Sequence, residues 1–332
     1  MDIQIDLRTV RKITNNFSDD QKVGTGRYGD AYKVIISFVK QAVYRGEVIA
    51  VKLLDTRQGF DDDQYKNELR NHMKVQHPNI VRLVGYCNDE TKKYIESNDG
   101  DSDFGKQIYR VLCFEYVPGG SLDKHISGKD CTTLQFDPLL FYCYLQKKNS
   151  LGDDWHTHYN VIKGICAGLL HLHCGRERPI LHLDLKPANI LLDKSMVPKL
   201  ADFGLSRIYL SSGSDAVVDS VAGANLKYKA SELKSGGKFS EMTDIFSLGV
   251  TIIDVIKGSH DFGQCGDKGA EEFIENVRGY WMKKDRTAHL DQVEICTKIA
   301  MRCVDPNSRE RPTIKEVVAN LHNMETQLLS QV

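Results

Sequence analysis

The chain has 332 residues, of which 41% are apolar and 27% are charged, and its formal net charge is -1. This composition is typical of a globular protein long enough for one large domain or two lobes, and it excludes intrinsic disorder. The near-zero charge argues against nucleic-acid binding, which usually brings a strong basic bias.

The cysteines and the N-terminus favour a cytoplasmic protein. The 9 cysteines are scattered and odd in number, which fits reduced thiols better than a disulfide framework. The charged start has no apolar signal region and no glycine after Met1, and no apolar run is long enough to span a membrane. We expect attachment to a membrane, if any, through a partner protein. The run HLHC at 171–174 matches no zinc spacing and is interpreted as structural.

The first predicted elements form a small β-rich lobe. Four apolar residues at helical spacing predict a short N-terminal helix: Leu7, Val10, Ile13 and Phe17. Strand-like and helical segments then follow in the order β, β, β, α, β, β. The polar, acidic stretch 88–106, which lies between the last two strands, is predicted to be a mobile loop.

Beyond the linker at Pro118, Gly119 and Gly120, helical apolar spacing dominates. The pattern predicts an α+β fold with an N-terminal extension, a β-rich lobe, a helical lobe and a tail: residues 1–20, 21–117, 118–325 and 326–332.

Residues 132–150, TTLQFDPLLFYCYLQKKNS, form an apolar and aromatic insertion in the helical lobe. Three interpretations stay open. The segment is a docking patch, a stretch packed on the lobe, or an unspliced intron in the gene model.

The run GTGRYG places Gly24, Gly26 and Gly29 in a GxGxxG turn, where glycine lets backbone amides approach phosphate oxygens. A dinucleotide site of the Rossmann type requires the turn to open a helix. The strand-like run AYKV follows instead, so we expect the turn to join two strands and to fold over a nucleotide.

Lys52 ends the apolar run VIAVK, and a lysine on a buried strand is costly unless it is paired. Glu68 on the following helix is the expected partner. The alternative is two surface charges that never meet.

Two further runs, HLDLKPAN and KLADFGLS, supply the polar residues that phosphoryl transfer from ATP requires. Asp184 can orient an attacking hydroxyl, and Lys186 can neutralise charge on the transferred group. Asn189 and Asp202 offer oxygen ligands suited to Mg²⁺. Lys52 can hold the α- and β-phosphates. These motifs occur in the order and approximate spacing of the protein-kinase signature set.

Along nearly its whole length, the sequence resembles eukaryotic protein kinases, in particular the plant receptor-like kinases related to Pelle. It is most similar to the kinase domain of cysteine-rich receptor-like kinases. The resemblance rests on six runs: NNFSDDQKVGTGRYG, NELRNHMKVQHPNIVRLVGYC, FEYVPGGSLDKHI, HLDLKPANILLD, SEMTDIFSLGV and RPTIKEVV. With no ectodomain or membrane span in the sequence, the matching type is a receptor-like cytoplasmic kinase.

The resemblance implies a bilobal fold with ATP in the cleft and Mg²⁺, or alternatively Mn²⁺, as the metal. It implies that Phe114 is the gatekeeper and that backbone groups of Glu115 and Val117 form hydrogen bonds with adenine. Three further residues are expected to contact the nucleotide: Ala31, Ala50 and Leu191. Three more are expected to be structural, Asp244 as an anchor and Glu232 with Arg311 as a buried ion pair. Lys186 favours serine/threonine over tyrosine specificity.

The first departure from the family pattern is Leu183, which stands where most members have an arginine that grips a phosphorylated activation segment. Such members are called non-RD kinases, and many act in innate immunity. Five serines after Asp202 are candidate phosphosites: Ser206, Ser211, Ser212, Ser214 and Ser220. We expect their replacement by alanine to change activity little.

Four other positions depart from the pattern. Ala31 replaces a valine above adenine, which could cost up to about 1.5 kcal/mol of nucleotide binding at roughly 0.8 kcal/mol per methylene. Ser231 replaces a proline, and Asn225 replaces a threonine that braces Asp184 and Lys186. His72 lies one turn after Glu68 where the family has an aliphatic residue. It either faces inward, towards His182 and Phe203, or is exposed by a rotated helix.

The sequence therefore predicts an ATP-dependent serine/threonine kinase that acts on a protein substrate, with a receptor or scaffold protein as a further candidate partner. The alternative is a pseudokinase, a scaffold that binds nucleotide weakly. The altered activation segment and the insertion favour that alternative, whereas the intact polar positions favour catalysis.

Overall fold

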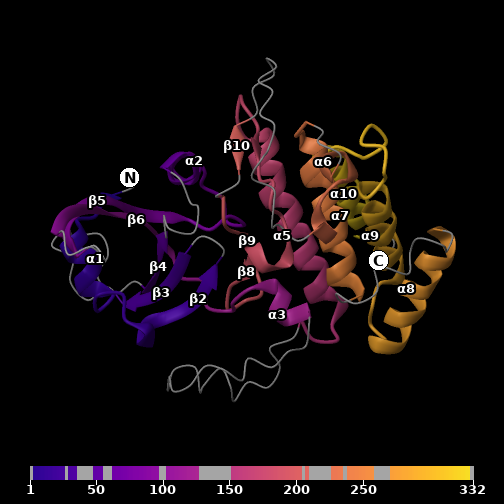
Figure 1. The fold of residues 1–332 in the computed structure, drawn as a ribbon. Coiled ribbons are helices and arrows are strands. Elements are labelled where there is room, and N and C mark those ends of the chain that lie inside the picture. The colour runs from indigo at the N-terminus through magenta and orange to yellow at the C-terminus, as the bar shows by residue number, and fades with distance from the viewer. Residues whose placement is uncertain are drawn as a thin grey trace. The chain divides into compact units, whose positions relative to one another are not determined.

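The computed structural model describes residues 3–26, 29–35, 48–54, 62–96, 102–126, 151–203, 206–208, 226–234, 238–257 and 270–329. The chain divides into a β-rich unit, drawn from 1–76, 81–117 and 203–205, and a helical unit that holds the rest (Figure 1). The predicted α+β fold with a β-rich and a helical lobe is confirmed. The insertion 132–150, Asn225 and the four serines from Ser211 to Ser220 lie outside the described residues.

The β-rich unit is built on one sheet with the strand order β1-β5-β6-β4-β3-β2. Its neighbours are antiparallel, except that β1 runs parallel to β5. The strands and helices are β1 (Ile3–Gln4), α1 (Leu7–Ile13), β2 (Lys22–Gly26), β3 (Gly29–Ile35), β4 (Val48–Leu54), α2 (Asp62–Met73), β5 (Leu83–Glu96) and β6 (Ser102–Glu115).

The N-terminal segment covers one face of this sheet. Leu7 and Val10 of α1 are buried in one apolar cluster with alternate residues of β3 and β4, among them Val34 and Val51. Because side chains alternate across a strand, this packing leaves the other set of β3 and β4 residues to the opposite face.

The N-terminal helix is shorter than its apolar spacing predicts, because α1 ends at Ile13. Asn15, Asn16 and Phe17 then adopt left-handed φ angles of 48°, 57° and 61°. Asparagine tolerates this conformation well, which explains the chain reversal. Phe17 still reaches the core, where its ring stacks on Tyr109 with the centroids 6.2 Å apart.

The prediction of a loop at 88–106 is wrong for the described residues 88–96 and 102–106, which are strand. Strands β5 and β6 continue as an antiparallel ladder out to the pair Glu96 and Ser102. An ion pair lies across this ladder, in which Lys106 Nζ is 3.3 Å from a carboxylate oxygen of Glu90. Composition alone suggested a loop, whereas backbone pairing and cross-strand charge pairs can hold a polar hairpin in the β conformation.

The helical unit contains most of the apolar core. Its helices are α3 (Leu122–Ile126), α5 (Trp155–Cys174), α6 (Ser231–Lys234), α7 (Glu241–Lys257), α8 (Ala270–Lys284), α9 (Leu290–Cys303) and α10 (Ile314–Leu329). Two short antiparallel sheets complete it, one of β7 (Ile180–Leu181) with β10 (Arg207–Ile208), and one of β8 (Ile190–Leu192) with β9 (Pro198–Leu200).

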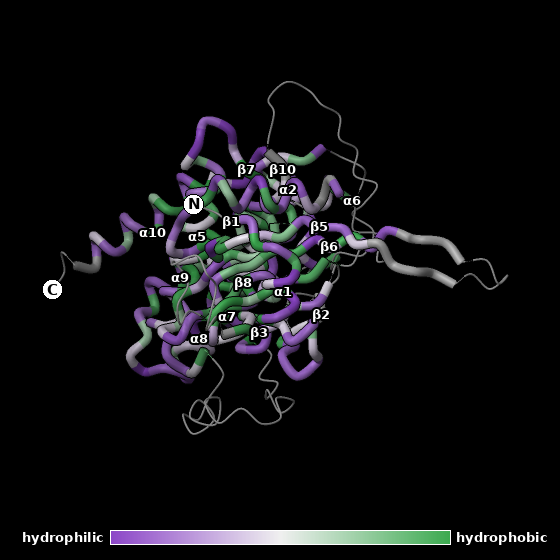
Figure 2. Tube along the Cα trace, turned by 90° about the vertical axis from the view of Figure 1, so that its left-hand side faces the viewer, coloured by the Kyte–Doolittle hydropathy of each residue, from purple (hydrophilic) through white to green (hydrophobic). Residues whose placement is uncertain are grey.

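Helix α7 is buried along almost its whole length and therefore lies at the centre of the helical unit. Apolar residues gather in the interior, whereas polar residues follow the outward turns of α9 and α10 (Figure 2). Trp155 at the start of α5 packs edge-on against Trp281 of α8, with the ring centroids 5.0 Å apart.

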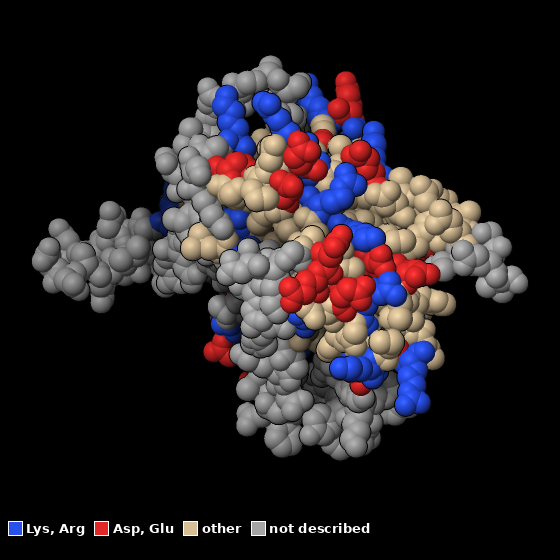
Figure 3. Space-filling view, turned by 90° about the vertical axis from the view of Figure 1, so that its right-hand side faces the viewer, with Lys and Arg blue, Asp and Glu red and all other residues tan. Residues whose placement is uncertain are grey.

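The outer face that carries α8 mixes acidic and basic side chains (Figure 3). Glu294 of α9 illustrates the pattern, since it accepts hydrogen bonds from Arg278 of α8 and from Lys298 on its own helix. Over the ranges that the structure describes, no helix is both long and apolar enough to cross a bilayer.

Candidate active site

Lys52 shares a sheet face with several predicted nucleotide-binding residues. Cross-strand pairing sets Ala31 opposite Lys52 and Phe114 opposite Ala50. Paired residues and residues two apart on a strand point to the same side. These four side chains therefore lie together on the face opposite α1.

Helix α2 supplies the partner of Lys52. The Nζ atom of Lys52 lies 2.8 Å from the Oε1 atom of Glu68, whose side chain is fully buried. The predicted ion pair is confirmed, and the alternative of two separated surface charges is wrong. A buried pair of this kind costs desolvation, but the loss of one partner costs more because it strands the other charge.

The glycine turn joins β2 to β3, as the sequence predicts, with Gly26 paired to Gly29. Gly29 has a φ of 152°, and a Cβ there would meet the carbonyl oxygen of Leu53 at 1.9 Å. Glycine is therefore required at this position. A Cβ on Gly24 would meet nothing within 4 Å, so the described residues leave open space beside this glycine.

His72 faces inward, which confirms one of the two interpretations of its position. Its side chain is buried. Its ring stacks on Phe203 with the centroids 4.2 Å apart and meets Phe114 edge-on at 4.8 Å. The histidine therefore connects the helix of Glu68 with the predicted gatekeeper and with the residue after Asp202.

The predicted hinge residues lie at the end of β6 and directly after it. The backbone N–H of Glu115 donates to the carbonyl of Arg82 at 3.0 Å, and Glu115 Oε1 accepts from the backbone N–H of Arg82 at the same distance. Val117 is buried at the end of this unit. The Glu115 side chain thus holds the strand end from which adenine is expected to be bound.

Within the helical unit, Asp184, Lys186 and Asn189 form one cluster. Asp184 Oδ2 accepts hydrogen bonds from Lys186 Nζ at 2.7 Å and from Asn189 Nδ2 at 2.8 Å. Asn189 Nδ2 also donates to the backbone carbonyl of Asp184 at 2.9 Å. This arrangement fixes the carboxylate next to an ammonium group, which suits the orientation of a hydroxyl and the neutralisation of phosphate charge.

Asn189 and Asp202 are joined through the backbone. The carbonyl of Asn189 accepts from the N–H of Ala201 at 2.9 Å, which places the two predicted metal ligands on neighbouring segments. Because the amide nitrogen of Asn189 is engaged by Asp184, its amide oxygen points elsewhere. An amide oxygen and a carboxylate fit a hard cation such as Mg²⁺. Leu191 lies in the middle of β8 and is half-buried.

Asp244 of α7 holds the backbone that precedes Asp184. Its carboxylate accepts from the backbone N–H groups of His182 at 2.7 Å and Leu183 at 2.8 Å, and from His173 Nε2 at 2.9 Å. Burial opposes ionisation, but these hydrogen bonds and the nearby histidines hold the pKa of Asp244 below its usual value. Leu183 has a left-handed φ of 64° that this carboxylate stabilises.

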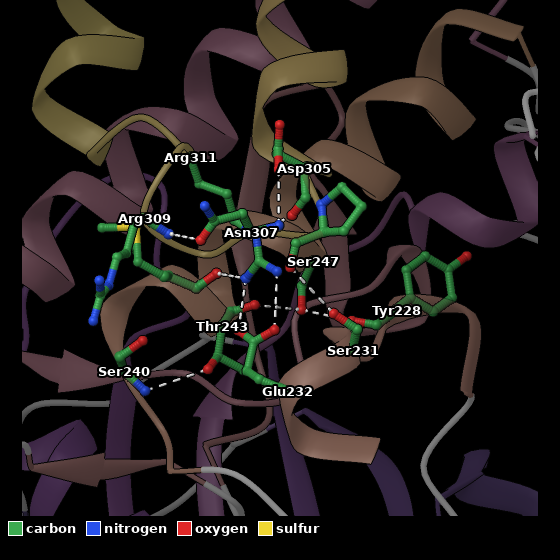
Figure 4. Close-up of polar contacts among 12 residues, drawn as sticks. Tyr228, Ser231, Glu232, Ser240, Thr243, Ser247, Asp305, Asn307, Arg309 and Arg311 are labelled. Carbon is green, nitrogen blue, oxygen red and sulfur yellow. Dashed lines mark hydrogen bonds and ion pairs between the residues drawn. The ribbon is translucent and has the colours of Figure 1, made fainter. Parts of the chain in front are cut away.

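The end of the activation segment, which we define as residues 202–232, is anchored by Arg311 (Figure 4). Arg311 binds the Glu232 carboxylate through two nitrogens at 2.6 and 2.9 Å, and its guanidinium is fully buried, so the predicted pair is confirmed. Ser231, in place of proline, donates to the carbonyl of Pro306 at 3.4 Å. The serine thereby keeps this corner attached to the chain around Arg311.

Sequence reasoning missed one polar cluster in this region. Lys227 and Tyr228 both contact Asp254, a buried residue of α7. The signal was present in the sequence, because a single aspartate in the apolar run VTIIDVIK requires a partner.

Comparison with known proteins assigns the family. Residues 17–322 match the model of the protein kinase domain. The chain belongs to the protein kinase family. It is 32% identical over 96% of its length to cysteine-rich receptor-like protein kinase 10 of Arabidopsis thaliana, and covers 43% of that protein.

Other relatives agree on a kinase domain of the plant receptor-like type. Cysteine-rich receptor-like protein kinase 44 of Arabidopsis thaliana is 30% identical over 96% of this chain and 76% of its own length. The G-type lectin S-receptor-like serine/threonine-protein kinase SD1-13 of the same plant is 31% identical over 92% of this chain and 33% of its own length. The kinase domain described above spans less than half of most of these relatives.

Proposed function

We propose that this kinase domain transfers the γ-phosphate of ATP to a serine or threonine hydroxyl of a protein substrate, with Mg²⁺ as the metal. The observation that carries the proposal is the cluster of Asp184, Lys186 and Asn189. In this cluster one carboxylate oxygen binds both an ammonium group and an amide. An oriented carboxylate next to an ammonium group is what phosphoryl transfer to a hydroxyl requires.

In this proposal the residues divide the work of binding and orientation. Lys52, held by Glu68, binds the α- and β-phosphates, and the amides of the glycine turn cover them. Asn189 and Asp202 would hold Mg²⁺, and the bound metal would neutralise negative charge on the phosphates. Asp184 orients the attacking hydroxyl, and Lys186 stabilises the charge of the transferred group.

The adenine is expected to bind beside Phe114, with hydrogen bonds to backbone groups of Glu115 and Val117. The resemblance makes Leu191 part of the adenine pocket as well. Ala50 and Ala31 are on the same sheet face as Lys52. A small residue at 31 predicts ATP binding weakened up to roughly tenfold relative to valine.

The rival proposal is a pseudokinase that serves as a scaffold. It is favoured by the changes at Asn225 and Ser231 in the activation segment and by the insertion 132–150. Leu183 does not add to it, because the backbone of Leu183 is anchored at Asp244 together with that of His182, and the Asp184 cluster is assembled with a leucine at this position. We therefore favour catalysis.

An in vitro assay with labelled ATP and Mg²⁺ tests the proposal. Wild type should phosphorylate itself or a generic protein substrate, and Asp202→Ala should reduce the rate at least a hundredfold. Lys298→Met serves as the control, because that lysine forms an exposed surface pair with Glu294. Equal, background-level phosphate transfer by wild type and Asp202→Ala would reject the proposed kinase activity. The absence of a thermal shift with Mg·ATP would also reject nucleotide binding.

The kinship with receptor-like kinases supports a signalling role, with plant defence as the proposed pathway for a non-RD member. The kinase would then operate in the cytoplasm, at a membrane only through a receptor or scaffold partner. Co-purification of the chain from plant extract with a membrane receptor would support this placement. Its retention on membranes that have been stripped of receptor and scaffold proteins would contradict it.

A further inference from the structure

Three side-chain hydrogen bonds tie the turn Leu226–Tyr228 to α7. Lys227 Nζ donates to Asp254 Oδ1 at 2.5 Å, and the Tyr228 hydroxyl donates to Asp254 Oδ2 at 2.6 Å. The Ser247 hydroxyl donates to the backbone carbonyl of Tyr228 at 2.8 Å. The turn is therefore fixed at its side chains and at its backbone.

The carboxylate of Asp254 requires these partners because its side chain is only 1% exposed. A buried carboxylate is stable only when it is paired and hydrogen-bonded. Burial, followed by the hydrogen bond to Asp254, raises the pKa of Tyr228, so the tyrosine stays a neutral donor. Lys227 therefore supplies the positive charge at this carboxylate.

The same helix holds the catalytic loop, by which we mean residues 182–189, HLDLKPAN. Asp244 lies ten positions before Asp254 on α7, which corresponds to about 15 Å along the helix axis. Asp244 binds the backbone N–H groups of His182 and Leu183, directly before Asp184. One buried helix thus carries the anchors of both the catalytic loop and the Leu226–Tyr228 turn.

We propose that Lys227 is a positioning residue whose ion pair with Asp254 fixes the Leu226–Tyr228 turn relative to Asp184 without a phosphate group. The proposal rests on the proposed kinase function. In kinases that use a phosphate for this purpose, the cation belongs to the catalytic loop and the anion to the activation segment. Here Leu183 provides no cation, and the polarity is reversed: the segment carries Lys227 and α7 carries the carboxylate.

The turn also presents an apolar side chain to solvent, because Leu226 is 65% exposed. A turn with a fixed backbone offers this side chain at a defined position to a protein substrate. Loss of the ion pair should therefore weaken protein-substrate binding more than nucleotide binding, which depends on Lys52 and Asp202.

The test compares Lys227→Met with Lys227→Arg, which keeps the positive charge, and with Lys298→Met as the surface control. Amide hydrogen exchange at residues 226–229 should be at least tenfold faster in Lys227→Met and unchanged in the other two. The KM for a protein substrate should rise at least fivefold in Lys227→Met, with the KM for Mg·ATP within twofold of wild type. Unchanged exchange in Lys227→Met would overturn the proposal.

The proposal also predicts that the turn does not depend on phosphorylation of the activation segment. Replacement of Ser211, Ser212, Ser214 and Ser220 together by alanine should leave exchange at 226–229 as in wild type, and faster exchange would contradict the proposal. The exchange measurement needs no catalysis, so it separates the failure of this proposal from the failure of the proposed function, which the Asp202→Ala comparison decides. If Lys227→Met does not fold, the double variant Lys227→Met/Asp254→Asn removes both charges, and it should fold yet show the same faster exchange.

Discussion

His72 shows how one residue can connect a helix to a predicted nucleotide site. It lies between Phe203 and Phe114, where the family pattern has an aliphatic residue, and its imidazole stacks on one aromatic ring and meets the other at its edge. Aromatic contacts of this kind contribute about 0.5–1.5 kcal/mol beyond the area that they bury. The histidine is therefore a packing element of α2.

We predict that His72→Ala lowers the free energy of unfolding by about 2–4 kcal/mol, because it removes a ring from a buried stack. His72→Phe, which keeps an aromatic ring, should stay within about 1.5 kcal/mol of wild type. Urea unfolding measures both changes. A thermal-shift titration with Mg·ATP reports whether Glu68 of α2 still holds Lys52 in place for nucleotide binding. Equal stability of the alanine and phenylalanine variants would show that stacking is not what holds this helix.

Ser206 is a poor phosphosite in this structure, although it follows Asp202 closely in sequence. Its side chain is fully buried, and its hydroxyl donates to the carbonyl of His182 at 3.1 Å. A phosphate there would place two negative charges against a carbonyl oxygen. The serines between 211 and 220 are the better candidates for a test of phosphorylation.

We predict that Ser206→Ala costs about 1 kcal/mol of stability, the usual net value of one hydrogen bond. Ser206→Asp should cost at least about 3 kcal/mol, because it buries an unpaired carboxylate. Chemical denaturation measures both changes. A well-folded, fully active Ser206→Asp variant would show that this side chain can turn to solvent.

At the scale of single elements, α5 depends on a defined N-terminal cap. Asp154 accepts from the backbone N–H groups of His156 at 3.2 Å and Thr157 at 2.9 Å, and from the Thr157 hydroxyl. The hydrogen bond from the Thr157 side chain is the largest of the effects that lower the pKa of Asp154, ahead of the backbone N–H groups. The cap is therefore strongest when Asp154 is ionised.

We predict that Asp154→Ala destabilises the kinase domain by about 1 kcal/mol at pH 7. Because the pKa of Asp154 is lower in the folded than in the unfolded protein, its ionised form contributes stability above the unfolded pKa near 3.8, and this contribution is lost as pH falls through the lower folded value. The stability difference between wild type and the variant should thus shrink below pH 3.8. A difference that stays constant in urea unfolding from pH 7 to pH 3 would contradict this account.

The elements also show what the sequence can and cannot predict. Lys52 and Glu68 were predictable, because a buried lysine demands a partner and the next helix offers one. The extension of β5 and β6 over residues 88–96 and 102–106 was not, since its stability comes from backbone pairing between residues that composition alone assigns to a loop. Lys227 was missed for a different reason: the buried Asp254 signals that it needs a partner, but the sequence does not show which residue lies next to it in the fold.

At the scale of the whole molecule, the question is whether the helical unit needs the predicted insertion at 132–150 for its stability. The chain that follows it is anchored by its own contacts. Leu151 is buried, the backbone N–H of Trp155 donates to Asp285 Oδ2 at 2.9 Å, and its indole N–H donates to Gln292 at 3.0 Å. None of these contacts involves the insertion.

We therefore predict that deletion of residues 132–150 leaves the melting temperature within about 3 °C of wild type, the change expected for less than about 1 kcal/mol in a domain of this size. Loop shortening itself carries only a small entropic effect. Differential scanning calorimetry measures the midpoint, and Trp155→Ala serves as a positive control that should lower it by much more, since it removes a fully buried ring. A drop of 10 °C or more on deletion would show that the segment is packed on the helical unit. An unchanged midpoint with altered substrate binding would favour a docking role, and an unchanged midpoint with unchanged activity would fit a segment absent from the working protein.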